Sequence, residues 1–485
     1  MTDTIEVMSG LAPRARRPRR DPLLRALKAP QPQSPEDVEE VEEPSRAPGE
    51  PSEQGQVTLQ QARSRGLLGW LQILGPGLIT GASDDDPSGI GTYSQVGSQF
   101  GYGLLWTALF TFPLMAAVQE LCARIALQTG VGLGVSLRRK FPTWIVGVCV
   151  LALFLANTIN VGADLGAVAA GGQLLSRGWI REGWLIVPVG LLILALQVFV
   201  SYRLIFKIFK WLTMALFAYV VTAFIVHPPL QQVVLATLVP HLEFNKDFVT
   251  ALVAVLGTTI SPYLFFWQAS SEVDEMRAAG MKTEEQRHGV RTEELKAARA
   301  DILIGMLFSN LVMFFIILVA GAVLHAHGKT GIQTADQAAQ ALAPIAGPYA
   351  FVLFAVGMIG TGLLAIPILS GSAAYALKEF LNLPGSLASN PRFRPTFYVI
   401  IALAVVAGIG MNYIGLDPIR ALFYTAVING LVAPPLLVLI VLLGSDRKFM
   451  EERVSGGVSK FLTWLATGLM AAAAVALVVT TYFIR

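Results

Sequence analysis

The sequence has little charge for its length, and this shortage is the first guide to its class. Of the 485 residues, 14% are Asp, Glu, Lys or Arg, while 54% are hydrophobic. Soluble domains carry roughly 25% charged residues. Residues 1–65 hold ten of the 36 basic and eleven of the 33 acidic residues, which leaves 48 charges for the other 420 residues. A body this poor in charge predicts a polytopic membrane protein.

Cysteine is almost absent. Cys122 and Cys149 are the only two, and both lie in apolar runs, which argues against a disulfide framework and a cysteine-based zinc site. The net charge of +3 is too small to indicate a nucleic-acid partner. The arginine-rich stretch at residues 14–20 lacks the apolar core and cleavage site of a secretory signal.

Residues 1–65 mix an arginine cluster, an acidic run and scattered Pro, Ser and Gln. Such a segment cannot bury enough apolar surface to offset its ordering entropy, so we expect a disordered cytosolic tail. A solvated extension is favoured over a regulatory or lipid-contacting role, in which the arginines would bind anionic headgroups.

Apolar segments able to cross the roughly 30 Å hydrocarbon core of a bilayer recur from Leu67 onward. Eleven are expected, near residues 67–98, 103–128, 142–173, 183–201, 205–226, 249–270, 302–324, 345–376, 396–414, 419–443 and 460–483. They form two sets of five within residues 66–226 and 249–443, separated by an external loop at 227–248. An internal loop and the eleventh span occupy residues 444–485.

Basic residues divide unequally between alternate connections. With the N-terminus inside, the internal loops hold twenty Lys and Arg residues and the external side six, and the N-terminal tail adds ten. This bias predicts a cytoplasmic N-terminus and an external C-terminus in the plasma (inner) membrane. The longest internal connection, residues 271–301, has Glu and Arg at helical spacing and is expected to form a solvated helix.

The feature that a bilayer makes most costly lies in the first span. The motif GPGLITGASDDDPSGIG, residues 75–91, contains Asp84, Asp85 and Asp86, followed by a proline and two glycines. Carboxylates at membrane depth usually mark an ion pathway, and Pro with clustered Gly frees backbone groups that lipid cannot satisfy. A helix broken around a cation site, with carbonyls near Ser83 facing the ion, answers both problems. The alternative is a polar turn between two short apolar pieces.

The sixth span carries a matching interruption. In AVLGTTISPYLFFWQASS, residues 254–271, the pair Ser261-Pro262 breaks an apolar helix one turn after Thr258. Discontinuous segments in corresponding positions of two halves point to a transporter binding site. A simple proline kink is the alternative, but the pairing with the first span favours the site.

Other polar residues lie within the spans. Asp164, midway through the third, fits a proton site, an outer-sphere partner or a capped structural residue equally well. Asn310 and Asn429, in spans seven and ten, are expected to bridge helices by hydrogen bonds rather than to line a pathway.

Two polar pairs lie near the span ends. Glu120 is expected to form an ion pair with Arg124. His325 and His327 have the spacing of an external metal pair, although an isolated HxH in a loop is usually only solvated.

From Gly75 to Gly130 the chain resembles the opening of the Nramp divalent-metal transporters. The segments GPG, Asp86-Pro87, SQFGYGLLW and QELCARIALQTG follow that family in order, and similarity continues through Asp164-Leu165 and Pro262 over nearly all of residues 67–443. The resemblance implies an all-α polytopic membrane protein with a LeuT-like fold, made of two inverted five-helix repeats plus an eleventh helix.

Several residues of this sequence differ from the family's metal-site pattern, and these differences indicate which metal is expected. Typical members have Asp-Pro-Gly-Asn in helix one, and Gly89 stands at the metal-ligating Asn. They have Met-Pro-His in helix six, where Ser261 replaces the thioether ligand and Tyr263 the His. A second helix-six His and two of three helix-three acids are also replaced; these positions are Gln268, Asn157 and Ala167, while Asp164 remains.

Loss of the sulfur ligand leaves an all-oxygen site, which favours hard cations, and small side chains leave room for the waters that Mg²⁺ retains. The pattern resembles the Nramp-related magnesium transporter branch. We therefore expect import of hydrated Mg²⁺, and also Mn²⁺, by alternating access without obligatory proton coupling. Asp86 would be the principal ligand, assisted by Asp84, Asp85 and the hydroxyl groups of Thr258 and Ser261. No resident cofactor, enzymatic activity or obligate protein partner is expected; the partners are the metal ions and the bilayer.

Three rival functions remain at this stage. A proton-coupled Mn²⁺/Fe²⁺ importer would use Asp164 for the proton, with Tyr263, Asn310 and Asn429 as further proton or outer-sphere candidates. An intramembrane aspartyl protease would need two catalytic carboxylates sharing a proton, and its G-x-G-D signature is missing from the sequence. A non-transporting receptor or scaffold would show no metal flux.

Overall fold

The structure is a computed structural model that describes residues 75–200, 214–332, 334–387, 392, 394–415 and 417–482. Every regular element in these ranges is a helix. The expected tail at residues 1–65, the start of the first span and the first half of the fifth lie outside the described residues.

Nine helical segments of the described chain are long and apolar enough to cross a membrane. They comprise α7 (Trp106–Thr129), α9 (Thr143–Leu175), α10 (Glu182–Phe199), the pair α14 (Lys246–Thr259) and α15 (Pro262–Ala278), α17 (Thr292–Val323), α20 (Ala350–Leu381), α21 (Pro395–Met411), α22 (Pro418–Gly444) and α24 (Gly457–Tyr482). The short pair α5 (Pro76–Asp84) and α6 (Pro87–Phe100) forms another segment, and α12 (Phe217–Val226) is the described end of the fifth. The fold is thus the expected all-α, LeuT-like arrangement of two five-helix repeats and an eleventh helix.

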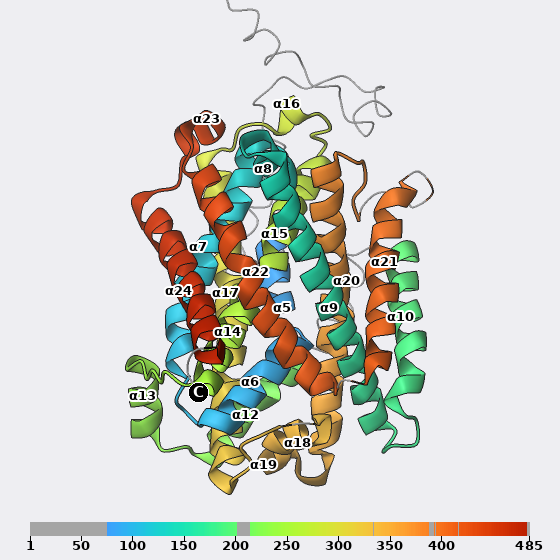
Figure 1. Cartoon of the computed structure of the whole chain (residues 1–485), viewed down its shortest axis with the longest axis vertical. Coiled ribbons are helices and arrows are strands. Elements are labelled where there is room, and N and C mark those ends of the chain that lie inside the picture. The colour runs from blue at the N-terminus through green and yellow to red at the C-terminus, as the bar shows by residue number, and fades with distance from the viewer. Residues whose placement is uncertain are drawn as a thin grey trace, which may run out of the picture. The chain divides into compact units, whose positions relative to one another are not determined.

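Short helices from alternate connections gather at opposite ends of the bundle (Figure 1). One end, called here the α8 end, holds α8 (Leu133–Lys140), α16 (Glu284–Arg287) and α23 (Arg447–Met450). The other, called the α13 end, holds α13 (Leu230–Leu238), α18 (Ala335–Ala339) and α19 (Ala343–Ala346). Three of the connections expected to be internal, those that contain α8, α16 and α23, therefore share the α8 end.

The expectation of a single solvated helix over residues 271–301 is wrong. Helix α15 continues to Ala278, α16 is a single turn, and α17 begins only at Thr292. Gly280 and Gly289, with φ of 91° and 95°, separate the three pieces. Only glycine adopts this backbone conformation at no steric cost.

Helices one and six are both interrupted, and by the same local chemistry. Helix α5 ends at Asp84, and α6 restarts at Pro87 with Asp86 as its N-cap residue. Helix α14 ends at Thr259, and α15 restarts at Pro262. Proline is favoured at the first position of a helix because it has no N–H to donate and its φ is already helical. Both expected breaks are confirmed.

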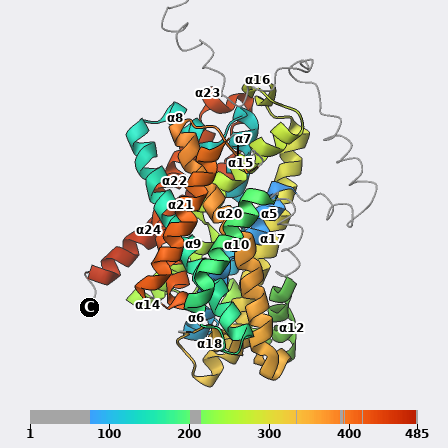
Figure 2. The same ribbon diagram turned by 90° about the vertical axis from the view of Figure 1, so that its right-hand side faces the viewer.

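Helix α5 packs on α17 (Figure 2). We call this contact the α5–α17 seam; it consists of Gly77, Gly81 and Asp84 on α5 and of Asp301, Gly305 and Ser309 on α17. Asp301 accepts a hydrogen bond from the Gly77 N–H at 2.7 Å, at the start of α5. One turn on, a Cβ atom built on Gly81 would lie only 2.2 Å from the carbonyl carbon and oxygen of Gly305. One turn further, the Ser309 hydroxyl donates a hydrogen bond of 2.7 Å to Asp84, the last residue of α5. Small residues allow such close helix approach in membranes, so the seam fixes the half-helix along its whole length.

Helix α9 is anchored in the same way to the other side of the bundle. A Cβ atom on Gly162 would lie 3.0 Å from the carbonyl oxygen of Gly408 in α21, and Asn412 donates a hydrogen bond of 2.7 Å to the Gly162 carbonyl. Helices α10 and α21 lie side by side at this edge (Figures 1 and 2). Helix α9 is therefore a fixed support beside the breaks.

Candidate metal site

Asp86 occupies the gap between α5 and α6 and is fixed there by its role as a helix cap. Its Oδ1 atom accepts hydrogen bonds from the Ser88 hydroxyl at 2.6 Å and from the Gly89 N–H at 2.7 Å. Capping of this kind satisfies backbone donors that the first turn of a helix leaves free. The side chain is 1% exposed, so the carboxylate is held rigidly inside the protein.

The second oxygen of Asp86 faces two other helices. Asn160 of α9 places its Nδ2 atom 3.4 Å from Oδ2, and Tyr263 of α15 places its hydroxyl at the same distance. The Tyr263 hydroxyl also donates to the Ser83 carbonyl at 3.0 Å. One carboxylate thus joins both broken helices to α9.

Asp84 and Asp85 point away from Asp86's partners, toward α17. The Ser309 hydroxyl lies 2.7 Å from Asp84 Oδ2 and 3.3 Å from Asp85 Oδ1. The remaining oxygens, Asp84 Oδ1 and Asp85 Oδ2, are buried and have no hydrogen-bond partner among the described residues. The acidic triplet is therefore divided between two faces.

The two breaks meet at Gly89 and Thr258. A Cβ atom on Gly89 would lie 3.3 Å from the Asp84 carbonyl oxygen and 3.5 Å from the Thr258 hydroxyl. The Ser261 hydroxyl donates within its own chain segment, to the Thr258 carbonyl at 2.7 Å. The Ser83 carbonyl, which we expected to face a cation, accepts the Tyr263 hydroxyl in this structure, and the Thr258 carbonyl accepts the Ser261 hydroxyl.

Asp164 lies on α9 close to Asp86 and Ser88. It is fully buried, and neither of its oxygens makes a hydrogen bond of normal geometry with a described residue. Asp164 is thus a further buried carboxylate beside the first break.

The two membrane asparagines behave differently. Asn310 donates to the Ala108 carbonyl and faces the Thr111 hydroxyl, so it bridges α17 to α7 as expected. Asn429 is buried in α22, and neither end of its amide has a partner within the described chain.

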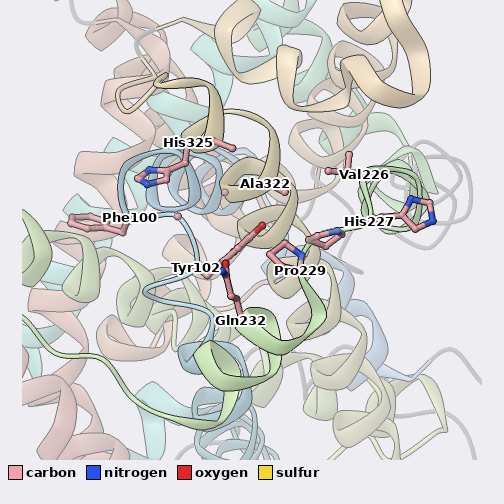
Figure 3. A pocket seen from close by; sticks show the side chains of 12 residues that line it. Phe100, Tyr102, Val226, His227, Pro229, Gln232, Ala322 and His325 are labelled. Carbon is pink, nitrogen blue, oxygen red and sulfur yellow. The ribbon is translucent and has the colours of Figure 1, made fainter.

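The pairs near the span ends are structural. Glu120 forms the expected ion pair with Arg124 and also accepts a hydrogen bond from Ser459. His325 lines a cavity of about 490 Å³ beside Phe100 and His227. Figure 3 shows the imidazole rings of His325 and His227 far apart at this cavity. The Nδ1 atoms of His325 and His327 face the backbone carbonyls of Ser98 and Val323, at 2.8 and 2.7 Å. His325 and His327 thus each use one ring nitrogen in a separate backbone contact, and no metal-binding group of three or more His, Cys, Asp or Glu side chains in the described residues includes them.

Three consecutive basic residues at the C-terminus of α8 bind three other segments of the chain. Arg138 donates to the Phe380 carbonyl, Arg139 forms a two-pronged ion pair with Glu284 at 2.5 and 2.9 Å, and Lys140 binds Asp446 at 2.6 Å. The Lys140 hydrogen bond holds the pKa of Asp446 below its ordinary value.

Helix α8 is held at its other terminus as well. The buried carboxylate of Glu379 in α20 accepts from the Gly134 N–H and from the Ser270 hydroxyl, both at 2.8 Å. Helix α8 therefore connects the ends of spans six, eight and ten with the loop between spans six and seven.

The sequence did not predict two residues that contact the aspartates at the first break. Asn160 stands one helical turn before Asp164, and Ser309 immediately precedes Asn310. The only available signal was their spacing from polar residues already singled out.

The donor set at Asp86 consists of oxygen and amide groups. No group of three or more His, Cys, Asp or Glu side chains in the described parts of the chain is arranged to hold a metal ion alone. A cation at Asp86 would therefore take its further ligands from amide, hydroxyl or carbonyl oxygens and water, as hard cations accept.

Two broken helices that meet at buried carboxylates within an all-helical, multi-pass bundle define a membrane transporter of LeuT-like fold. A family model described as "Natural resistance-associated macrophage protein-like" matches residues 77–480. The chain belongs to the Nramp family.

Curated relatives match along almost their full length. The divalent metal cation transporter MntH of Bacillus subtilis (strain 168) is 26% identical over 426 residues, covering 86% of this chain and 94% of the relative. MntH of Klebsiella pneumoniae subsp. pneumoniae is 25% identical over 405 residues, covering 82% and 92%.

Solved structures share the fold. The Eremococcus coleocola manganese transporter, in complex with an aromatic bis-isothiourea substituted compound, superposes with a TM-score of 0.64 at 17% identity, over 92% of this chain and 90% of that one. Mhp1, a nucleobase-cation-symport-1 family transporter, gives 0.51 at 15% identity, over 85% and 94%.

Proposed function

We propose that this protein is a secondary transporter that imports Mg²⁺, and also Mn²⁺, across the plasma membrane by alternating access. Its relatives are named divalent metal cation transporters and a manganese transporter, which supports a divalent cation as cargo. The observation that carries the choice of cation is the surroundings of Asp86 Oδ2, where the neighbouring polar groups are the amide of Asn160 and the hydroxyl of Tyr263.

Ligand chemistry supports this choice. Sulfur and imidazole ligands favour transition metals, whereas carboxylate, carbonyl and water suit Mg²⁺ and Mn²⁺. Ser261 supplies oxygen at the second break, and Tyr263 follows one residue after Pro262. Mg²⁺ usually keeps several waters and needs only one or two carboxylates, so Asp86 with retained water meets its requirement. Asp84 and Asp85 add negative potential from the α17 side.

Alternating access would use the two half-helix pairs. With the α8 end in the cytoplasm, as the distribution of basic residues favours, the N-terminus is internal and the C-terminus external. A negative-inside potential then drives entry, contributing about 4.6 kcal/mol per 100 mV for a dication, at ~2.3 kcal/mol per charge. No proton is required for that driving force.

A proton-coupled Mn²⁺/Fe²⁺ importer is the second candidate, and one observation favours it. Asp164 is a buried carboxylate near Asp86 without a hydrogen bond of normal geometry among the described residues, and such residues often relay protons in transporters. Proteoliposomes containing an internal pH dye separate the two candidates. Acidification in fixed proportion to Mg²⁺ or Mn²⁺ uptake would reject uncoupled transport.

The main test is uptake of Mg²⁺ into proteoliposomes with Mn²⁺, Cd²⁺ and Ca²⁺ as competitors. We expect Mg²⁺ flux, inhibition by Mn²⁺, and loss of flux in Asp86→Asn. Asp336→Asn, which makes the same change at an exposed position on α18, should transport normally. Absence of Mg²⁺ flux from folded protein, or full flux in Asp86→Asn, would contradict the proposal.

A further inference from the structure

The two oxygens of Asp86 are not equivalent. Oδ1 is occupied by two short hydrogen bonds, from the Ser88 hydroxyl at 2.6 Å and the Gly89 N–H at 2.7 Å. Oδ2 has only two contacts, both at 3.4 Å, which is long for a hydrogen bond. Oδ2 is therefore the atom that faces a cation with least loss of existing bonds.

The two groups next to Oδ2 differ in what they can offer an ion. The Tyr263 hydroxyl already donates to the Ser83 carbonyl at 3.0 Å. The Asn160 amide presents its nitrogen to Oδ2, while its carbonyl oxygen is fully buried and has no hydrogen-bond partner among the described residues. A buried carbonyl oxygen without a partner is costly, and here it belongs to a side chain adjoining Asp86.

We propose that Asn160 is a metal ligand, binding the cation through its side-chain oxygen beside Asp86 Oδ2. This inference rests on the proposed function. The two ends of a carboxamide have nearly the same shape, and rotation about χ2 of Asn is broad. Rotation by half a turn exchanges Nδ2 and Oδ1, which replaces a donor facing a carboxylate by an acceptor facing a cation.

The spacing fits this role. Neighbouring oxygens on an octahedral Mg²⁺ with bonds of about 2.1 Å lie about 3.0 Å apart. The Asn160 nitrogen lies 3.4 Å from Asp86 Oδ2, so the exchanged oxygen would need to approach by only about 0.4 Å. A neutral amide oxygen is also the kind of ligand that hard cations accept.

Because Asn160 lies on α9, a cation bound to it would also link two helices. Gly162, two residues later, is packed against Gly408 of α21, so α9 is held by the neighbouring helix. A cation bound by Asp86 and Asn160 would join the break in helix one to this support. Cation binding would thereby favour the arrangement in which both are in contact.

The chain contains a matched control. Asn157 lies three residues earlier on α9 and is equally buried, and its Oδ1 atom likewise has no partner within the described chain. Its Nδ2 atom, however, donates to the Leu369 carbonyl of α20 at 3.4 Å, whereas that of Asn160 faces Asp86. The same substitution at both positions separates proximity to the cation from loss of a buried amide.

The experiment measures Mg²⁺ and Cd²⁺ uptake by the full chain in proteoliposomes, after size-exclusion chromatography has established folding. Asn160→Ala should raise the KM for Mg²⁺ by roughly tenfold or more, the range seen when groups supporting a metal site are lost. Asn157→Ala should change it far less. Equal effects of the two substitutions, or none at Asn160, would overturn the inference.

A second substitution distinguishes a ligand from a group that only orients Asp86. Asn160→Met supplies a soft sulfur, so it should weaken Mg²⁺ uptake and strengthen Cd²⁺ uptake. Equal loss of both ions would show that Asn160 acts only through Asp86 and would overturn the ligand role. Asp86→Asn is the reference for the proposed function, and full transport by that variant would contradict the function itself. If Asp86→Asn is inactive but Asn160→Ala transports normally, only the present inference is contradicted.

Discussion

Gly81→Ala tests whether the α5–α17 seam sets the position of the first half-helix. The added Cβ atom would lie 2.2 Å from backbone atoms of Gly305, where ordinary contact begins at 3.4 Å. The two helices must therefore separate by about 1.2 Å, because neither contact atom belongs to a side chain that can rotate away. Introducing one methylene into a well-packed interior typically costs about 1–3 kcal/mol.

This cost falls on arrangements in which α5 lies against α17. Arrangements in which α5 has moved away avoid it, so their population should rise by roughly 5- to 150-fold. The α8 end, where α5 begins, should open more often. Gly468→Ala is the control, since a Cβ atom there meets nothing within 4 Å among the described residues.

The assay is labelling by a membrane-impermeant maleimide at Thr80→Cys, a position that is fully buried on α5. The background lacks the two native cysteines, Cys122 and Cys149. Vesicles oriented with the α8 end outward should be labelled several-fold faster when Gly81→Ala is added. Equal labelling rates in the presence and absence of Gly81→Ala, with the folded state intact, would refute the idea that the seam controls this movement.

Three further predictions follow from the contacts described. Ser261→Met should increase Cd²⁺ uptake relative to Mg²⁺, because it places a soft ligand at the second break; unchanged ion competition would show that position 261 does not select by softness. Ser309→Ala should lower the free energy of unfolding by about 1–3 kcal/mol, because it removes the hydroxyl that donates a hydrogen bond to the buried carboxylate of Asp84. An unchanged melting temperature would contradict this. The Lys140–Asp446 bond should stabilise the fold above pH ~4 and be lost as the pH falls further, because the pKa of Asp446 is lower in the folded state than its unfolded value of about 3.9. The melting-temperature difference between parent and Asp446→Asn should therefore shrink on acidification; a constant difference from pH 7 to 3 would disagree.

The backbone of the site followed from the sequence because its causes are local. Asp86-Pro87 and Ser261-Pro262 each combine a capping or polar residue with a proline that can only begin a helix, and the structure places a break at both. Long apolar runs likewise determined the spans. The segment at residues 271–301 was misjudged because helical charge spacing was given more weight than Gly280 and Gly289.

The side-chain partners did not follow, because they depend on packing between distant helices. Asp84 and Asp85 turn toward Ser309 only because α5 lies on α17, and consecutive aspartates carry no sign of which helix each will face. Asn160 was overlooked for the same reason: its spacing from Asn157 and Asp164 places the three on one face of the helix, but it does not say which helix that face contacts. Its importance appears only when α9 is seen beside Asp86.

The three consecutive basic residues at the C-terminus of α8 have a practical consequence for following the transport cycle. Trypsin cleaves the peptide bond that follows an Arg or Lys residue. In this structure the side chains of Arg138, Arg139 and Lys140 each bind a different neighbouring segment. A molecule in which these contacts are intact should resist digestion at this place, and one in which they are broken should be cut between the second and third spans, whatever happens at the other Lys and Arg residues of the loops and tail. The rate at which peptides ending at residues 138–140 appear, followed by mass spectrometry, would then report the conformational balance without any introduced label.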